Sequence, residues 1–328
     1  MVLLSTLRSD AAAVRRARVE DFGGPCDALS DTTLAELAVA SLIEEAQLTP
    51  KPALVDARGS GAHRDLDLPL MLRSARALEP TFAALARASR GRMPSATLRA
   101  ELAQLGRAGE QNMMRATDGS NAHRGAIWIV GLLVAGAAIV FDEDAPLASP
   151  ALPLHAYVHA HPNTNAHSHA ARVCELAAQI ACFPDRFAAP ADSHGERARR
   201  RYRVGGARQE AQDGFPHVID VGLPALRAAR AKGIREDDAR LDALLTIMAS
   251  LDDTCLLHRA GLAGLRAGQR GARAVLAAGG ASTAAGRAAL DALDAELLSL
   301  NASPGGAADL LAATLFIDRL AHRAASGS

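Results

Sequence analysis

Two adjacent aspartates, Asp252 and Asp253, stand in the apolar stretch LDALLTIMASLDDTCLLHRAG at residues 241–261. The spacing of leucine and methionine predicts one helix over this stretch. Two neighbouring carboxylates in apolar surroundings repel each other and are costly to bury unless they meet a cation. The pair is therefore a candidate for metal binding or catalysis. The alternative is that one carboxylate points to solvent and the other caps a helix.

A second acidic pair, Asp65 and Asp67, ends the segment KPALVDARGSGAHRDLDL at residues 51–68. Mg²⁺ takes oxygen ligands and keeps several waters, so two carboxylates and a ligand phosphate can hold it. The basic side chains of the segment suit phosphate oxygens, and they are Lys51, Arg58, His63 and Arg64. The alternative is a charged surface loop with local ion pairs, in which Asp67 caps the next helix.

Two loop-to-helix junctions could bind anions, because backbone N–H groups at a helix N-terminus attract negative charge. One is GEQNMMRATDGSNAHRGAIW at 109–128, and the other is NASPGGAADLLAA at 301–313. The residues concerned are Asn121, His123 and Arg124 at the first junction, and Ser303, Gly305 and Gly306 at the second. The glycines would let a ligand approach the bare backbone. The alternative at both places is an ordinary capped helix start.

Three polar segments lie between these motifs. GGARQEAQDGFPHV at 205–218 places Arg208 and Glu210 after two glycines. The arginine run SHGERARRRYR at 193–203 is typical of a solvated helix face, and nucleic-acid binding is disfavoured because aromatic side chains to stack on bases are scarce. The histidines of 155–170 could bind a transition metal, but no Cys or Glu stands at ligand spacing, which favours a polar loop. They are His155, His159, His161, His167 and His169.

The composition predicts an all-α fold made of a single large helical domain. Of the 328 residues, 49% are hydrophobic and only 3% aromatic, and alanine and leucine are common whereas strand-forming residues are scarce. We expect helices over 31–48, from about 68 to 80, 95–117, 125–140, 170–182, 241–261 and 303–323, with Asp31 or Thr32 as the first cap. Residues 31–328 would form this domain, and residues 1–30 an appended segment.

The charge balance and the cysteines limit the location and the partners of the chain. Lys and Arg together number 36, as do Asp and Glu, so no overall field draws the chain to nucleic acid or to a membrane. The N-terminus lacks the order of a secretory signal. The longest apolar stretch, 126–140, is shorter than the roughly 20 residues of a membrane span and predicts a buried helix. Four cysteines without a CxxC pair favour a reduced, cytoplasmic protein.

Five of these segments occur in the order seen in one enzyme family. KPALVDARGSGAHRDLD, GEQNMMRATDGSNAHRGAI, GGARQEAQDGFPHV, LDDTCLLHRAG and SPGGAADLLA together resemble the triphosphoribosyl-dephospho-CoA synthases, over roughly residues 33–320. The chain departs from the usual family pattern at three places. Ala53 replaces a glycine, Ala122 and Arg124 alter NTHKG to NAHRG, and Cys255 replaces an asparagine.

The resemblance implies an all-helical enzyme that converts ATP and 3′-dephospho-CoA to 2′-(5″-triphosphoribosyl)-3′-dephospho-CoA and adenine. A separate transferase would attach this product to the acyl carrier subunit of malonate decarboxylase or citrate lyase, and the departures favour malonate decarboxylase. Cleavage of the N-glycosidic bond builds positive charge on the sugar, which carboxylates can stabilise. A homodimer is one candidate for the oligomeric state, which the sequence leaves open.

We expect the motif residues to share the work of this reaction. The candidate catalytic residues are Asp252, Asp253 and Glu110. Ligands of Mg²⁺, bound with ATP, would be Asp65, Asp67 and Asp253. Substrate-binding residues would be Lys51, His63, Arg64, Asn121, His123, Arg124, Arg208, Glu210, Ser303, Gly305 and Gly306. Two alternatives stay open: a helical Mg²⁺-dependent hydrolase of nucleotide or ADP-ribosyl N-glycosidic bonds, and a non-catalytic nucleotide-binding module.

Overall fold

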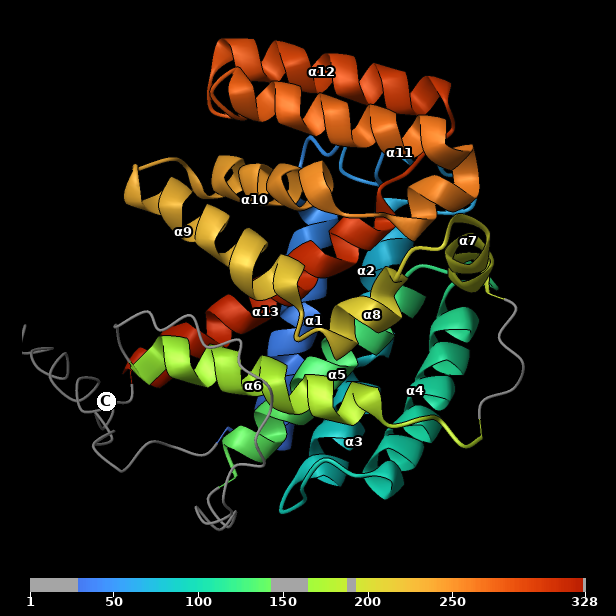
Figure 1. Ribbon diagram of the computed structural model, residues 1–328, viewed down its shortest axis with the longest axis vertical. Coiled ribbons are helices and arrows are strands. Elements are labelled where there is room, and N and C mark those ends of the chain that lie inside the picture. Colours follow the sequence, from blue (N-terminus) through green and yellow to red (C-terminus); the bar gives the residue numbers. More distant parts are fainter. Residues whose placement is uncertain (1–28, 143–164, 188–192, 327–328) are drawn as a thin grey trace, which may run out of the picture.

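The computed structural model of the protein describes residues 29–142, 165–187 and 193–326 (Figure 1). Within these ranges the chain is helical and contains no strand, apart from one isolated bridge between Asp56 and Gly59. The helices are α1 Asp31–Gln47, α2 Leu68–Ala77, α3 Glu79–Ser89, α4 Ala96–Ala116, α5 Arg124–Val140, α6 Asn165–Cys182, α7 His194–Tyr202, α8 Gly206–Gln212, the π-helical η1 His217–Gly222, α9 Leu223–Ala231, α10 Glu236–Ser250, α11 Thr254–Ala277, α12 Ala284–Ser299 and α13 Gly305–Ser326. The predicted all-α fold is confirmed.

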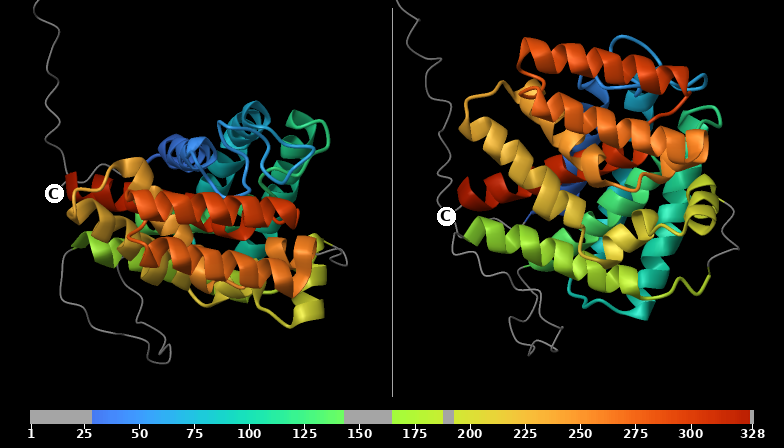
Figure 2. Two further views of the ribbon diagram at one scale, coloured as in Figure 1. Left: turned by 90° about the horizontal axis from the view of Figure 1, so that it is seen from above. Right: turned by 45° about the horizontal axis from the view of Figure 1, so that its top comes forward.

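Helix α13 runs through the middle of the molecule (Figures 1 and 2). It packs against α1, α5, α6 and α10, and its central turns are buried. Helices α11 and α12 pack side by side as a pair and form the upper layer in Figure 1. The N-terminus of α13 therefore lies inside the fold, where other helix starts can reach it.

Helix α5 forms from the longest apolar stretch and is a buried core helix, as predicted. Every residue from Ile129 to Ile139 is buried. Gly136 packs directly on α6, because a Cβ atom at this position would lie 2.5 Å from the carbonyl oxygen of Val173. Among the described helices, none combines the length and the hydropathy that crossing a membrane requires.

The predicted helix over 241–261 is wrong, because the chain breaks at the aspartate pair. Helix α10 ends at Ser250 and α11 begins at Thr254, with Asp253 as the N-cap of α11. Aspartate side chains compete for backbone N–H groups and so favour caps over helix interiors. Elsewhere the boundaries shift less: Ser30 caps α1 in place of Asp31 or Thr32, and the expected helix from 68 to 80 ends at Ala77 before α3 begins.

The loop between α1 and α2 uses most of its charges to hold itself together. The buried carboxylate of Asp56 accepts hydrogen bonds from the backbone N–H groups of Lys51 and Arg58, both at 2.8 Å. Arg58 also pairs with Asp56 and with Asp294 of α12, which in turn accepts a hydrogen bond from Ala53 N–H at 2.6 Å. Arg58 is therefore part of the scaffold of the loop.

Ala53 adopts a backbone conformation that normally favours glycine. Its φ is +54°, in the left-handed region. A residue with a Cβ atom pays about 1–2 kcal/mol to stay there. The glycine usual at this position in the resembled family would avoid that cost. The turn thus keeps a glycine-like shape although its residue is alanine.

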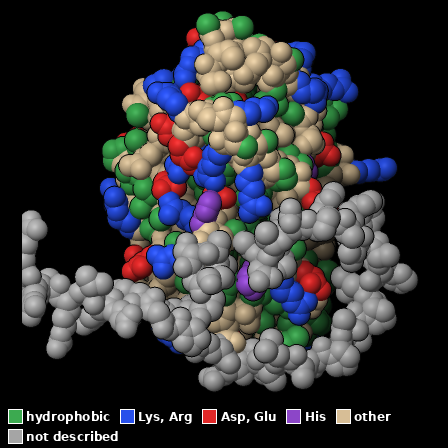
Figure 3. Space-filling view, turned by 90° about the vertical axis from the view of Figure 1, so that its left-hand side faces the viewer, with side chains coloured by type: hydrophobic (Ala, Val, Ile, Leu, Met, Phe, Trp, Pro, Cys, Tyr) green, Lys and Arg blue, Asp and Glu red, His purple; other side chains and the backbone are tan. Residues whose placement is uncertain are grey.

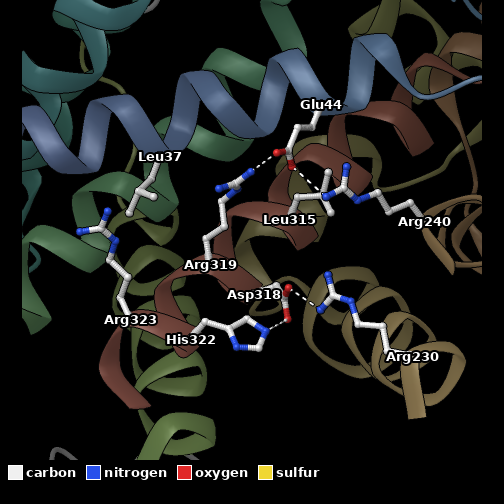
Figure 4. A pocket seen from close by; sticks show the side chains of 9 residues that line it. All are labelled: Leu37, Glu44, Arg230, Arg240, Leu315, Asp318, Arg319, His322 and Arg323. Atoms are coloured by element: carbon white, nitrogen blue, oxygen red, sulfur yellow. Dashed lines mark hydrogen bonds and ion pairs between the residues drawn. The ribbon is translucent and has the colours of Figure 1, made fainter. Parts of the chain in front are cut away.

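A small pocket of about 340 Å³ is closed by ion pairs that join four helices (Figure 4). Glu44 of α1 pairs with Arg319 of α13 and with Arg240 of α10. Asp318 of α13 pairs with Arg230 of α9 at 2.7 Å. Each carboxylate here faces a guanidinium group, so the network ties α1, α9, α10 and α13 together.

Charges of both signs are interspersed on the face of the molecule seen in Figure 3. Lys and Arg side chains stand next to Asp and Glu, and no broad patch of one sign forms on that face. This agrees with the formal net charge of zero. An anionic ligand would have to be held by a local group of donors, not by a global field.

Candidate active site

A pocket of about 1240 Å³ opens where the starts of α5, α8, α11 and α13 meet the loop between α1 and α2. Helices α4 and α7 complete its wall with Arg99 and Arg199. Pockets for a single small ligand usually measure roughly 300–1,000 Å³. This pocket is therefore large enough for an extended ligand or for two ligands side by side.

The pocket gathers most of the residues that the sequence motifs predicted. The predicted residues in its lining are Lys51, His63, Asp65, Asn121, His123, Arg124, Arg208, Glu210, Asp252, Asp253, Ser303, Gly305 and Gly306. Those predicted residues that do not line it are Arg64, Asp67 and Glu110. Residues as far apart in the sequence as Lys51 and Gly306 thus contribute to one cavity, which no single motif could have shown.

Asp253 joins two helix starts at the base of the pocket. Its Oδ1 accepts hydrogen bonds from the N–H groups of Cys255 at 2.7 Å and Leu256 at 3.3 Å, and its Oδ2 accepts one from Ala307 at 2.9 Å. Burial raises the pKa of Asp253, and these N–H groups oppose the shift. We predicted that the backbone N–H groups of the SPGG turn meet a phosphate. The Asp253 carboxylate already accepts a hydrogen bond from one of them, that of Gly306. Asp253 therefore has a structural function, and Asp252 beside it is exposed to the pocket.

Asp309, which the sequence analysis did not single out, is a partly buried carboxyl group in the same pocket. Its Oδ2 lies against Gly125, where an added Cβ would be only 2.0 Å away. Burial raises the pKa of Asp309 well above its ordinary value, and the carboxylates of Glu45 and Asp253 raise it further. Its surroundings therefore favour the protonated form of Asp309 more than water does for an exposed aspartate.

Lys51 forms a buried ion pair beneath the pocket. Its Nζ donates to Glu45 Oε1 at 2.5 Å and to the Glu45 carbonyl oxygen at 2.7 Å, and both side chains are almost fully buried. Lys51 was predicted to hold a phosphate, but its charge is already balanced by Glu45. A buried ion pair of this kind is costly to break. Lys51 thus contributes its charge to the pocket floor together with its partner.

Two neutral histidines line the pocket. Burial, with a further contribution from Lys51, lowers the pKa of His123 to about 4. Its Nδ1 lies 2.7 Å from Ser74 Oγ, whereas its buried Nε2 has no hydrogen-bond partner. Burial and the charge of Arg259 lower the pKa of His63 to about 4. Both rings are uncharged at neutral pH, so they can form hydrogen bonds with a ligand but add no positive charge.

The remaining predicted residues of the first junction support the start of α5. Arg124 forms an ion pair with Glu110, and its Nε is buried without a hydrogen-bond partner. Its backbone N–H donates to Asn121 Oδ1 at 3.2 Å. Glu110, predicted as a catalytic residue, is thus placed where it holds Arg124 and lies outside the pocket lining.

Glu210 is held by a neighbouring histidine. Its two carboxylate oxygens accept hydrogen bonds from the backbone N–H and from Nδ1 of His217, both at 2.8 Å. The carboxylate is buried at the edge of the pocket. Arg208, two residues before it, is exposed in the pocket lining.

Two acidic residues of the pocket lining are open to a magnesium ion that arrives with a phosphate ligand. Asp65 and Asp252 are exposed carboxylates in the lining. Asp67 instead caps α2 through Leu70 N–H at 2.8 Å, and the oxygens of Asp253 accept backbone hydrogen bonds. In the described parts of the chain, no group of three or more His, Cys, Asp or Glu side chains is arranged to hold a metal alone. Mg²⁺ needs only one or two carboxylates when phosphates supply other ligands.

The histidine-rich segment and the cysteines add little to the site. His155, His159 and His161 lie outside the described residues, as does the side chain of His167. Three described cysteines, Cys174, Cys182 and Cys255, are free thiols. Cys255 lines the pocket, and burial raises the pKa of its thiol well above the ordinary value, so the thiol stays protonated.

Comparison with known proteins identifies the family of the chain. The sequence model of the family described as ATP:dephospho-CoA triphosphoribosyl transferase matches residues 31–328. The chain belongs to this family. The resemblance that the five motifs indicated is thereby confirmed, and the family is one of transferases.

Three relatives illustrate the similarity. The 2-(5″-triphosphoribosyl)-3′-dephosphocoenzyme-A synthase of Klebsiella pneumoniae is 54% identical over 288 residues, which cover 88% of this chain and 94% of that protein. Proteins named "Probable 2-(5″-triphosphoribosyl)-3′-dephosphocoenzyme-A synthase" from Azotobacter vinelandii and Pseudomonas paraeruginosa are each 56% identical over 288 residues. These residues cover 87% and 88% of this chain, respectively, and 90% of each relative. No solved structure matches the chain.

Sequence reasoning missed Asp309, Glu45 and Arg99 for different reasons. Asp309 stands alone in the apolar run GGAADLLAATLF, and that isolation was a usable signal. Glu45 lies in a helix that reads as amphipathic, and only the folded loop brings Lys51 to it. Arg99 stands in a polar helix and becomes buried because Trp128 of another helix covers it.

Proposed function

We propose that this chain transfers the triphosphoribosyl group of ATP to the 2′-hydroxyl of 3′-dephospho-CoA and releases adenine. The observation that carries the proposal is the large pocket that unites the family motifs around the partly buried Asp309. Its volume of about 1240 Å³ suits two nucleotide-sized substrates. Membership of the transferase family and the names of the relatives support the same reaction.

The reaction requires one proton to leave the acceptor and one to reach adenine. The bond from C1′ to the adenine nitrogen breaks while a bond forms from C1′ to the 2′-oxygen of dephospho-CoA. The exposed carboxylate of Asp252 would take the proton of the attacking hydroxyl. The protonated carboxyl of Asp309 would donate a proton to a ring nitrogen of the departing adenine. Exchange with water then restores both groups.

Carboxylates close to the sugar would also stabilise the positive charge that develops at C1′. Asp252, exposed at the start of α11, is the candidate for this stabilisation, since Asp253 is buried and its oxygens accept backbone hydrogen bonds. Uncharged His123, with its free Nε2, would bind a polar atom of the substrate without repelling that charge. Mg²⁺ bound with ATP would be held by Asp65 together with phosphate oxygens and water, and it would neutralise phosphate charge.

The product would serve a carrier protein, as the family resemblance implies. A separate transferase would attach it to the acyl carrier subunit, which we assign to malonate decarboxylase before citrate lyase. A cytoplasmic setting fits the free thiols of Cys174, Cys182 and Cys255. A homodimer is included in the proposal and can be tested by sedimentation.

Product analysis tests the function directly. The purified chain is incubated with Mg²⁺–ATP and 3′-dephospho-CoA, and the mixture is examined by mass spectrometry. The proposal predicts free adenine and the triphosphoribosyl adduct in equal amounts. Adenine with ribose triphosphate, formed without dephospho-CoA, would indicate a hydrolase instead. ATP binding with neither product would indicate a non-catalytic module.

A further inference from the structure

Arg99 is a buried arginine in the wall of the large pocket whose function the family motifs do not explain. Only 8% of the residue is exposed, and its Nε is buried without a hydrogen-bond partner. Buried N–H groups in folded proteins almost always have a partner. Leaving a guanidinium in this state costs free energy unless a ligand supplies the missing acceptor.

Trp128 of α5 holds the guanidinium group of Arg99 in place. The Arg99 Cζ lies 4.9 Å from the centroid of the Trp128 ring. The indole is itself fixed, because its Nε1 donates a hydrogen bond to the carbonyl oxygen of Ala207 at 3.0 Å. An arginine stacked on an aromatic ring presents its planar set of donors in a preorganised orientation.

The charges around Arg99 favour an anion. Asp185 lies near Arg99, but it forms an ion pair with Arg107 at 2.7 Å. Burial lowers the pKa of Arg99; Asp185 opposes this shift, whereas Arg107 and Arg208 add to it. Arg107 and Arg208 thus add positive charge around Arg99, and the nearby Asp185 is already paired with Arg107. A ligand with several negative charges would relieve the mutual repulsion of these arginines.

We propose that Arg99, stacked on Trp128 and flanked by Arg208, binds the phosphoric-anhydride chain of a substrate. This inference rests on the proposed function, and the chain could be the triphosphate of ATP or the pyrophosphate of dephospho-CoA. Arginine suits such a ligand because its donors match phosphate oxygens in pairs. Trp128 follows Gly125, the contact of Asp309, by three residues, or about 4.5 Å of helix rise. The anhydride site therefore adjoins the proposed reaction centre.

Tryptophan fluorescence can report on this site, because Trp128 is the only tryptophan of the chain. The emission is followed while tripolyphosphate, ATP or dephospho-CoA is added, and the dissociation constant is taken from the midpoint. We expect Arg99→Met, which retains packing on the indole, to weaken tripolyphosphate binding by about 10- to 100-fold. Arg99→Lys keeps the charge but loses the planar donors, so its affinity for tripolyphosphate should lie between those of the wild type and Arg99→Met.

The two substrates distinguish the source of the anhydride. If Arg99→Met weakens ATP binding and spares dephospho-CoA, the site holds the triphosphate. The opposite result assigns the pyrophosphate of dephospho-CoA. The matched control is Arg270→Met, since Arg270 is exposed, pairs with Glu296 and lies outside the pocket. This control should bind all three ligands as the wild type does.

Chemical unfolding separates a binding role from a structural one. A buried guanidinium without a full set of partners destabilises the free protein, so Arg99→Met should unfold at the same or a higher urea concentration than the wild type. Unchanged affinity for all three ligands in the Arg99→Met protein would overturn the inference even if adenine release proceeds. Tripolyphosphate binding that depends on Arg99, without any adenine release, would instead contradict the proposed function alone.

Discussion

The large and the small pocket contain the same kinds of charged side chain but differ in how those charges are paired. In the small pocket, Glu44 and Asp318 each face an arginine, and the pairs join four helices (Figure 4). In the large pocket, Asp309 lies near other carboxylates, and Arg99 lies near other arginines. Charges of like sign held together are unfavourable in the free protein. The comparison therefore favours a stabilising function for the small pocket and supports the proposed ligand binding in the large one.

The largest expected effect is on activity, from Asp309→Asn. The amide fits the same space but cannot donate a proton to adenine, so adenine release should fall by about 10²- to 10⁴-fold. The unfolding free energy should change little, because the amide has about the same size as the protonated carboxyl group and, like it, carries no charge. Adenine is measured by chromatography and stability by urea unfolding. Turnover within tenfold of the wild type would remove Asp309 from the proton transfer.

Asp253→Ala should cause the largest loss of stability. The change removes the cap of α11 and the acceptor for Ala307 of α13, which leaves buried N–H groups without partners. We expect the unfolding free energy to fall by about 3 kcal/mol. Asp253→Asn retains one acceptor oxygen and should lose less. Equal stability of Asp253→Ala and the wild type would show that the two helix starts do not depend on this carboxylate.

The buried histidine His123 should make the protein sensitive to acid. Its folded pKa of about 4 lies below the ordinary 6.5, so it stabilises the fold above pH 6.5, and this contribution is lost as the pH falls toward 4. As the pH falls through this range, the unfolding free energy of His123→Asn should decline less steeply than that of the wild type. The two slopes should differ by about 1 kcal/mol per pH unit. Urea unfolding at closely spaced pH values measures the slope. A slope identical to that of the wild type would show that His123 titrates alike in both states.

The smallest effect is expected in the small pocket. Glu44→Gln weakens the pairs with Arg240 and Arg319 and should lower the unfolding free energy by about 1 kcal/mol. Adenine release should remain at the wild-type rate, because the pocket lies apart from the motif residues. A tenfold loss of turnover in a folded Glu44→Gln protein would contradict the division between the two pockets.

Local patterns predicted α1, α2, α4, α5, α6, α10 and α13 but neither the remaining helices nor the break at the aspartate pair. The hydrophobic spacing runs continuously from Leu241 past Leu251, and nothing local shows that Asp253 turns toward α13. Asp253 accepts a hydrogen bond from Ala307, which lies 54 positions further along the chain. Such a contact exists only in the folded chain, so periodicity could not reveal it.

The site was predictable where residues belong to family motifs and not where tertiary contacts change their meaning. His123 and Asp252, which the motifs predicted as substrate-binding and catalytic residues, both line the large pocket. Lys51 was predicted to hold a phosphate, and only the neighbouring helix α1 supplies the Glu45 that neutralises its charge. Arg99 becomes notable only through its burial against Trp128.

Adenine release from Mg²⁺–ATP, measured with and without 3′-dephospho-CoA, tests the central claim most directly. The wild type and Glu44→Gln should release adenine at equal rates, only when the acceptor is present and in equal amounts with the adduct. Asp309→Asn should release adenine at least about 10²-fold more slowly than the wild type. Equal losses in Asp309→Asn and Glu44→Gln, or release that ignores the acceptor, would contradict the assignment of this chemistry to the large pocket.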